Sequence, residues 1–432
     1  MSGVSRRSLL IGGATVAAVA LTPEIAHADD NARSTARTVT FTLNASTLDG
    51  GEQVTSLTLD TSCFDDIVAS SLTAGTFAVH AKAESPVPLP AGTLNFGAYD
   101  VDRVVTGVRL VRGRIVIDLQ SGFTNGVNPT TGAFTTVGAP GAGTLGYIVP
   151  GGRNLQSKLT YTITQKLPIT LRRGGALTLP GFVQGKLVNA EVDAYKYAKS
   201  ADGMNYRLYV PEGHSHDKKP LIVWLHGGGE GGLASLNYYD NEAPLRANRG
   251  SLGFSTDAAQ KVFGGAYVVA PQAESAWMAD GPGYAPRLKA LIDSLVKKYA
   301  IDPKRIHVVG CSNGGYMSLY MSYAYPKTFA SEVPICPGAS ATFFTEDQLK
   351  SITTPTWLVQ SADDTTLPPP VNSVRAHGLI SGSLLSLYDT VTWEGIRYAG
   401  HWSWIYVARN DPKIDGKHIW QWMAKQHLNS GH

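Results

Sequence analysis

The stretch that decides the fold is Gly310-Cys311-Ser312-Asn313-Gly314-Gly315. It follows the apolar run Ile306-His307-Val308-Val309, which predicts a buried strand, and it precedes residues 316–321, whose sequence YMSLYM predicts a helix. A Gly-x-Ser-x-Gly sequence between a strand and a helix is typical of a sharp turn that lifts the serine hydroxyl above the edge of a sheet. Glycine and serine are common residues, so the prediction depends on the strand and the helix around them.

Apolar runs alternate with helical patterns on both sides of this turn. Residues 221–225, 267–271 and 356–360 are apolar enough for buried strands, and residues 288–296 place leucine and isoleucine on one helical face. Strands that alternate with helices indicate a mostly parallel sheet that is covered by helices on both sides. We therefore predict a doubly wound α/β domain over residues 188–430.

Residues 36–180 have a different composition, in which Thr, Ser, Gly and Val dominate. Residues 38–43 and 76–81 alternate with a period of two, and residues 108–119 predict two strands that are joined by a tight turn. Short alternating strands separated by Gly and Pro turns indicate an all-β immunoglobulin-like sandwich. The stretch 121–152 is rich in Gly, Thr and Pro and predicts a loop.

The N-terminus has the features of an export signal. The pair Arg6-Arg7 precedes the mildly apolar stretch 11–21, and Ala26-His27-Ala28 is an A-x-A cleavage sequence. The arginine pair favours a twin-arginine signal peptide over residues 1–28, with an ordinary secretory signal as the alternative. The expected mature protein begins near Asp29 and is secreted.

Composition excludes several classes of partner. The chain of 432 residues has a formal net charge of +3 and no block of basic residues, so nucleic acid and a charged membrane surface are not expected partners. No segment after the signal is predicted to cross a bilayer. The chain contains three cysteines, Cys63, Cys311 and Cys336, too few for a disulfide scaffold. Cys311 and Cys336 can lie on neighbouring strands, and two buried thiols are favoured over a disulfide.

A catalytic serine needs a base to take its proton and a third group to orient that base. With the elbow serine, Ser312, the expected chain order is serine, acid, histidine. His401 is the candidate base, since it lies in a loop after residues 389–393, which we predict as the last strand. Asp363 and Asp364 compete as the acid, and the spacing before the following Leu-Pro pair favours Asp364.

The glycine-rich stretch His226–Gly232 follows the predicted strand at residues 221–225. Glycines let backbone N–H groups approach a developing oxyanion, so we predict that Gly227 and Gly228, together with Asn313, form the oxyanion hole. A phosphate-binding loop is disfavoured because the sequence lacks G-x-x-x-x-G-K-[ST]. We predict a structural role for His226.

Aromatic residues near these motifs are candidates for the substrate cleft. Trp277 and Trp402 are predicted to bind substrate, with packing in the core as the alternative. No H-E-x-x-H or paired-cysteine motif points to a metal site, and no cofactor is expected.

Five stretches resemble the α/β-hydrolase superfamily, and more narrowly its esterase D, polyhydroxybutyrate-depolymerase-like and prolyl-oligopeptidase-like branch. They are residues 224–229, 301–306, 310–315, 362–368 and 400–402. With a β-sandwich in front, the whole chain resembles bacterial esterases that carry an N-terminal immunoglobulin-like domain. The acid loop departs from the common His-Gly start, because it begins with Gln360-Ser361.

The resemblance implies hydrolysis of carboxylic esters through an acyl-enzyme, without a cofactor. It implies that Ser312 attacks the ester, His401 transfers the proton and Asp364 orients His401. No long insertion separates Ser312 from Asp364, which argues against a large lid. Short-chain esters or a polymer such as a polyester are the expected substrates. A prolyl-oligopeptidase-like peptidase and a binding protein with an inert hydrolase fold are the alternatives, and the oligomeric state stays open.

Overall fold

The structure is a computed structural model that describes residues 38–64, 66–127, 134–213 and 217–428. The predicted export signal, residues 1–28, lies outside the described residues. The described residues belong to one compact unit, Thr38–His432. Among them, no helix has both the length and the apolar character that crossing a membrane requires.

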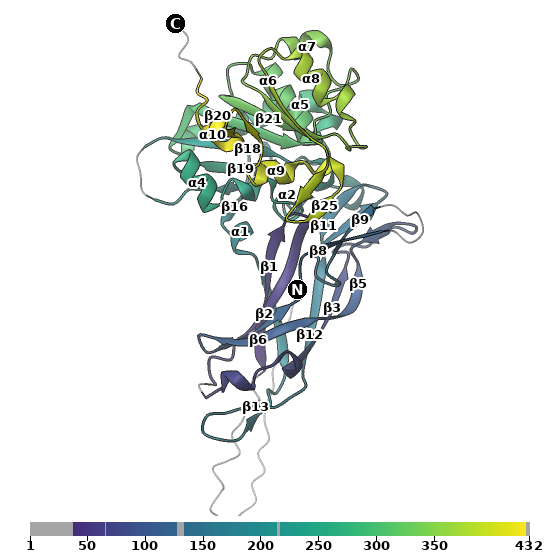
Figure 1. The fold of residues 1–432 in the computed structure, drawn as a ribbon, viewed down its shortest axis with the longest axis vertical. Helices are drawn as coiled ribbons and strands as arrows, with labels where there is room; N and C mark the ends of the chain where they lie inside the picture. Colours follow the sequence, from purple (N-terminus) through teal and green to yellow (C-terminus); the bar gives the residue numbers. More distant parts are fainter. Residues whose placement is uncertain (1–37, 65, 128–133, 214–216, 429–432) are drawn as a thin grey trace, which may run out of the picture. The chain divides into compact units, whose positions relative to one another are not determined.

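The second half of the chain is built on an eight-stranded sheet (Figure 1). Neighbouring strands from β19 to β23 run parallel, whereas β16 and β17 are antiparallel at one edge. This arrangement confirms the predicted mostly parallel sheet. The strands, in their order across the sheet, are β16 (Tyr195–Lys199), β17 (Asn205–Tyr209), β19 (Tyr267–Pro271), β18 (Lys219–Leu225), β20 (Ile301–Cys311), β21 (Ser331–Ile335), β22 (Trp357–Ser361) and β23 (Leu384–Tyr388).

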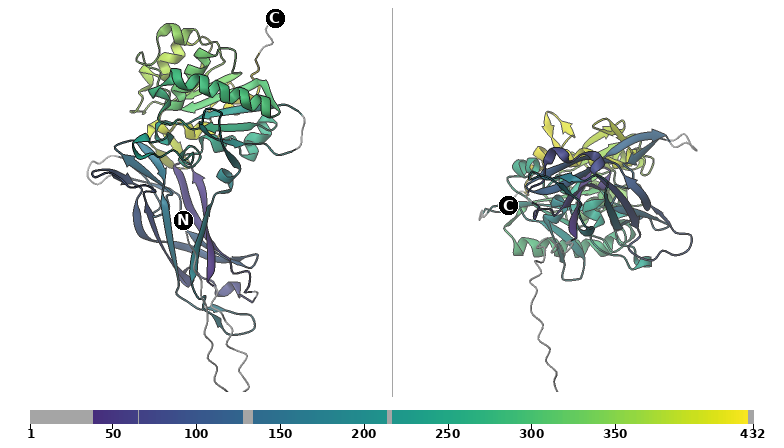
Figure 2. Two further views of the ribbon diagram at one scale, coloured as in Figure 1. Left: turned by 180° about the vertical axis from the view of Figure 1, so that it is seen from behind. Right: turned by 90° about the horizontal axis from the view of Figure 1, so that it is seen from below.

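Helices cover both faces of this sheet, and each face has its own core. Leu221, Val223 and Leu225 of β18 pack into one core, whereas Ile222 and Trp224 pack into the other, as the period-two geometry of a strand requires. The first core includes α5, which crosses one face of the sheet as a long green helix in the left view of Figure 2. The helices of this half are α1 (Ala190–Asp193), α2 (Ala243–Arg246), α3 (Gly250–Gly253), α4 (Asp257–Phe263), α5 (Gly281–Lys298), α6 (Asn313–Ala324), α7 (Glu346–Lys350), α8 (Ser373–Leu379), α9 (Trp404–Ala408) and α10 (Ile419–Ala424).

The predicted last strand, residues 389–393, is wrong. The last strand of the sheet is β23, which lies directly before that stretch. β24 (Val391–Trp393) instead pairs with β25 (Ile396–Tyr398) in a separate hairpin. Two short strand-forming runs follow one another here, and local pattern does not indicate which of them joins the sheet.

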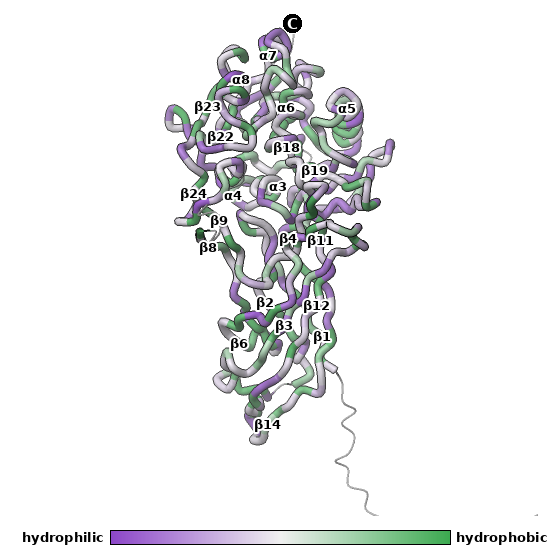
Figure 3. The backbone as a smooth tube through the Cα atoms, turned by 90° about the vertical axis from the view of Figure 1, so that its right-hand side faces the viewer, coloured by the Kyte–Doolittle hydropathy of each residue, from purple (hydrophilic) through white to green (hydrophobic). Residues whose placement is uncertain are grey.

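The N-terminal region is all-β. A five-stranded sheet and a three-stranded sheet share one apolar core, and green and purple segments follow one another along their strands in Figure 3. The immunoglobulin-like assignment stays a prediction. The first sheet contains β15 (Phe182–Val188), β1 (Val39–Leu48), β2 (Gly51–Leu59), β7 (Arg114–Leu119) and β6 (Val105–Val111), and the second contains β12 (Lys158–Gln165), β3 (Phe77–Glu84) and β5 (Tyr99–Arg103).

The predicted loop at residues 121–152 is also wrong. It contains the hairpin of β8 (Phe123–Val127) and β9 (Phe134–Gly138), followed by β10 (Leu145–Val149). β10 is the central strand of a small sheet between β4 (Leu94–Phe96) and β11 (Arg153–Gln156). Backbone pairing forms these strands despite their glycines, and strand propensity depends strongly on such context.

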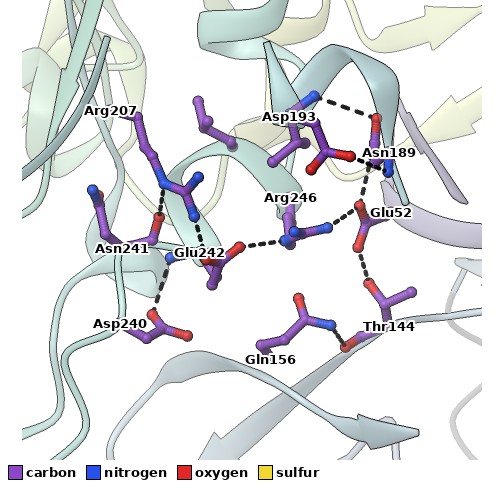
Figure 4. Close-up of polar contacts among 12 residues, drawn as sticks. Glu52, Thr144, Gln156, Asn189, Asp193, Arg207, Asp240, Asn241, Glu242 and Arg246 are labelled. Carbon is purple, nitrogen blue, oxygen red and sulfur yellow. Dashed lines mark hydrogen bonds and ion pairs between the residues drawn. The ribbon is translucent and has the colours of Figure 1, made fainter. Parts of the chain in front are cut away.

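A buried polar network joins the N-terminal region to the second half of the chain (Figure 4). Glu52 of β2 accepts from the Arg246 Nη1 of α2 at 2.5 Å, from the Asn189 amide at 2.7 Å and from the Thr144 hydroxyl at 2.6 Å. Arg246 also donates through Nε to Glu242 at 2.7 Å. A buried ion pair leaves an uncompensated charge when one partner is removed, so each half depends on the other.

Candidate active site

The predicted elbow is present at the carboxyl end of β20. Ser312 lies between β20 and α6 with φ 55° and ψ −112°, in the left-handed φ range that a residue with a side chain rarely adopts. A Cβ on Gly310 would lie 2.2 Å from the Gly314 carbonyl oxygen, and one on Gly314 would lie 1.9 Å from the Leu225 carbonyl oxygen. These contacts explain why the turn needs glycine on both sides of the serine.

His401 lies beside Asp364, as the order of motifs predicts. Its Nδ1 is 2.8 Å from the Oδ2 of Asp364. The other carboxylate oxygen accepts the backbone N–H groups of Thr366 at 2.9 Å and Leu367 at 3.1 Å. The Gln360 amide donates to Oδ2 at 2.8 Å, so the departure from the common His-Gly start supplies a donor to the acid. The carboxylate is therefore held from several sides.

Asp363, the competing aspartate, turns away from the histidine. Its Oδ2 is 3.1 Å from the Arg397 Nη2, and its Oδ1 accepts the Ser361 hydroxyl. The Asp363 side chain is partly exposed, whereas that of Asp364 is fully buried beside His401. The geometry supports Asp364 as the acid.

A thiol that we did not predict adjoins this pair. Burial raises the pKa of Asp364, but the hydrogen bond and the attraction from His401 outweigh burial, and its pKa lies below the ordinary value. Burial lowers the pKa of His401, but Cys336 and Asp364 beside it outweigh burial and raise that pKa above its ordinary value. Cys336 directly follows β21, at the same sheet edge as Ser312. Its position after an apolar run in the sequence could therefore have indicated that it lies near the site.

The donor atoms of Cys336, Asp364 and His401 lie within 4.8 Å of one another, which is also close enough for a metal ion. Asp364 and His401 already bond to each other directly. We therefore interpret the group as an acid and a base with a neighbouring thiol. Cys311 and Cys336 are both buried free thiols, in line with the favoured prediction.

The oxyanion loop, defined as Gly227–Gly232, lies against the elbow. A Cβ on Gly228 would be 3.7 Å from the Asn313 amide, so these two predicted donors adjoin each other. Asn313 is the first residue of α6, and the first N–H groups of a helix have no partner within the helix. Burial raises the pKa of Glu230 to about 7, while the N–H of Gly227 opposes that rise. The oxyanion hole of Gly227, Gly228 and Asn313 stays a prediction.

His226 has the structural role that we predict. Its Nε2 accepts the Ala273 N–H at 3.0 Å, so its Nδ1 carries the proton and donates to the Gly227 carbonyl at 2.6 Å. Burial lowers the pKa of His226 to about 4. A neutral histidine with both nitrogens bonded supports the loop and has no free position for substrate.

The elbow serine and the candidate base line one cleft of about 550 Å³. Trp402 lines this cleft, as predicted, and Trp404 lines it as well. Trp277 does not, because it is fully buried and donates through its indole N–H to the His226 carbonyl at 3.1 Å. The prediction of a substrate contact for Trp277 is corrected: it is a core residue behind the oxyanion loop.

The N-terminal region forms part of the cleft wall, which the sequence did not indicate. The lining residues from this region are Asp49, Gly50, Tyr147, Gly152, Arg153 and Asn154. Two of them also hold the oxyanion loop. The Asn154 amide donates to the Gly229 carbonyl at 3.2 Å, and Arg153 donates to the carbonyls of Gly232 at 3.2 Å and Ser275 at 3.3 Å. These are contacts between distant segments, which local patterns do not reveal.

Comparisons with known proteins support a hydrolase. Residues 285–364, which contain the elbow and Asp364, match the model of the prolyl oligopeptidase family. A stretch of 85 residues is 34% identical to the poly(3-hydroxyalkanoate) depolymerase C of Paucimonas lemoignei. The match covers 17% of this chain and 20% of the depolymerase, so the chain spans about a fifth of that relative.

A solved structure of a thermostable esterase is similar over most of the chain. The TM-score is 0.68 at 22% identity, and the superposition covers 90% of this chain and 99% of the esterase. At this identity the likeness concerns the fold. The chain therefore has the α/β-hydrolase fold, preceded by a β-rich N-terminal region.

Proposed function

We propose that this chain is a serine hydrolase that cleaves carboxylic esters through an acyl-enzyme. The observation that carries the proposal is the 2.8 Å contact between His401 Nδ1 and Asp364 Oδ2 in a cleft that Ser312 also lines. A nucleophile on a strained elbow, a base and a buried acid are the parts that acyl transfer requires.

In the proposed mechanism, the contact with Asp364 fixes the proton of His401 on Nδ1 and leaves Nε2 free to accept the proton of Ser312. The serine oxygen attacks the ester carbonyl, and the N–H groups of Gly227, Gly228 and Asn313 stabilise the oxyanion. His401 then gives the proton to the leaving alcohol. Water repeats the cycle on the acyl-enzyme and releases the acid.

Two observations bear on the substrate. The relative named as a poly(3-hydroxyalkanoate) depolymerase supports an ester, including a polymeric one. The match to the prolyl oligopeptidase family supports a peptidase as the second candidate, because the same triad can cleave an amide. The lining by Trp402, Trp404 and Tyr147 suits an apolar acyl or aryl group in either case.

Parallel assays on an ester and an amide distinguish the two candidates. The chain from Asp29 onward contains every described residue and is the form to assay. We expect rapid hydrolysis of p-nitrophenyl butyrate and little hydrolysis of a prolyl p-nitroanilide. Faster hydrolysis of the anilide would favour the peptidase, and inactivity on both would refute the proposed chemistry.

We also propose that the protein is secreted by the twin-arginine route. The proposal rests on Arg6-Arg7 and the Ala26-His27-Ala28 sequence. Replacing both arginines by lysine is expected to retain the unprocessed chain inside the cell, which immunoblotting of cell and medium fractions measures.

The raised pKa of His401 predicts the pH dependence of activity. Protonated His401 cannot accept the serine proton, so kcat/KM rises with pH through the pKa of His401, which lies above the ordinary value of about 6.5. Cys336→Ala removes one of the groups that raise this pKa, so the acid limb is expected to move to lower pH. The pH profile of kcat/KM measures the shift, with Cys63→Ala at an exposed thiol as the control. An unmoved acid limb would contradict the assignment.

The bond from Asn154 to the oxyanion loop predicts a positioning role. Asn154→Ala is expected to lower kcat roughly tenfold with little change in KM, a smaller loss than the 10²–10³-fold cost of removing an oxyanion donor. Steady-state kinetics on p-nitrophenyl butyrate measure the effect. Asn125→Ala is the matched control, because Asn125 donates to the Arg397 carbonyl at 2.7 Å, outside the cleft. Equal losses of kcat in both variants would indicate a general weakening of the fold.

A further inference from the structure

The small sheet of the N-terminal region continues the cleft wall outward. Its strand order is β11, β10, β4, so β10 lies between the two outer strands. Tyr147 of β10 is paired with Asn154 of β11 on one side and with Phe96 of β4 on the other. Side chains of directly paired residues lie on the same face of a sheet. Tyr147 and Asn154 line the cleft, so Phe96 lies on the same face, one strand farther from the catalytic serine.

This face becomes apolar and open to solvent as it leaves the cleft. Leu94 pairs with Val149, and the two lie two residues from Phe96 and Tyr147, on the same face. Leu94 is 54% exposed, Phe96 59% and Tyr147 40%. We call these four side chains, Leu94, Phe96, Tyr147 and Val149, the apolar ramp. Exposed apolar patches of this kind mark binding surfaces, and this one is continuous with the cleft.

We propose that the apolar ramp binds the chain of a hydrophobic polyester whose ester group lies at Ser312. This inference rests on the proposed function and specifies its substrate. A cleft of about 550 Å³ suits a ligand of drug-like size, so a polymer must leave it across a neighbouring surface. Tyr147 belongs to both the cleft and the ramp, so it links the two surfaces along the path of such a chain.

The chemistry of the ramp favours an apolar chain over a polysaccharide. None of its four side chains carries a charge, and the tyrosine hydroxyl is its single polar side-chain group. Asn154, the polar residue next to it on this face, already donates to the oxyanion loop. Recognition of a sugar polymer requires several placed hydrogen-bonding groups, whereas an aliphatic polyester gains from burial of its methylene groups.

The test compares a polymer with a short ester. The double variant Leu94→Ser/Phe96→Ser is assayed on a polycaprolactone emulsion and on p-nitrophenyl butyrate. The ratio of polymer to butyrate activity is expected to fall about tenfold, because two large apolar contacts are lost. Leu167→Ser/Val183→Ser is the matched control, since these residues are 47% and 48% exposed and do not line the cleft. The control is expected to leave the ratio within twofold.

A second measurement does not depend on catalysis. Adsorption to a polycaprolactone film is measured in the Ser312→Ala background with and without the ramp substitutions, and the ramp variant is expected to adsorb about tenfold more weakly. If the activity ratio and the adsorption are both unchanged, the apolar ramp does not bind polyester, even if butyrate hydrolysis confirms the esterase. A change of oligomeric state in the ramp variant, measured by sedimentation, would assign the face to contacts between copies of the chain. If the wild type does not hydrolyse the butyrate ester but its adsorption depends on the ramp, the esterase proposal is refuted and the proposal of a binding surface stands.

Discussion

Replacing Ser312 by alanine is expected to lower kcat by about a millionfold, the scale seen when a serine nucleophile is removed. The hydroxyl forms the covalent bond, and the two thiols nearest to it in the fold, Cys311 and Cys336, are both buried. Residual activity reflects only oxyanion stabilisation and binding. Hydrolysis of p-nitrophenyl butyrate by protein free of wild-type contamination measures the loss.

A second substitution at this position separates activity from stability. Ser312→Gly removes the same hydroxyl and also relieves the left-handed backbone, where φ is 55°. We expect the glycine variant to be equally inactive but to unfold at a higher temperature than the alanine variant. If the glycine variant has the lower melting temperature, the backbone at Ser312 is not strained. If the alanine variant is active, Ser312 is not the nucleophile.

Replacing Asp364 by asparagine is expected to lower kcat about 10⁴-fold, because an amide holds the histidine in the wrong tautomer while keeping the shape of the site. Asp364 Oδ2 accepts from His401, and the carboxylate is buried, so water cannot substitute for it. Steady-state kinetics measure the change, together with a circular dichroism spectrum that is expected to match the wild type.

Asp363→Asn is the matched control for this substitution, because it changes the adjacent residue in the same way. Asp363 pairs with Arg397 instead of the histidine, so kcat is expected to stay within about threefold. A large loss at Asp363 with a small loss at Asp364 would reverse the assignment of the acid. The pair of variants therefore decides between the two aspartates that the sequence left in competition.

The parts of the site that follow from local pattern were predictable. The elbow combines a strand, a glycine-flanked serine and a helix, and each has its own signal. The aspartate was favoured by its spacing from the following Leu-Pro pair, and the histidine by its place in the order of motifs. The serine and the aspartate lie at the carboxyl ends of the parallel strands β20 and β22, where the fold gathers functional loops, whereas His401 follows the antiparallel hairpin of β24 and β25.

The parts that depend on packing were not predictable. Trp277 resembles a cleft residue in sequence but lies behind the oxyanion loop, because only the folded structure shows which side of the loop it occupies. Arg153 and Asn154 reach the cleft from β11 of the N-terminal region, and no spacing relates them to Ser312. The strands within residues 121–152 were hidden by their glycines, because cross-strand pairing and not propensity forms them.

The buried Glu52–Arg246 contact has a consequence for protein engineering. The hydrolase half is not independent of the N-terminal region, since excision before residue 188 would remove Glu52 and leave the buried Arg246 with one of its two carboxylate partners, Glu242. A hybrid with a foreign N-terminal module would need to reproduce both that carboxylate and the loop contacts of Arg153. In an evolutionary lineage with this architecture, the two halves would be inherited together and diverge in step.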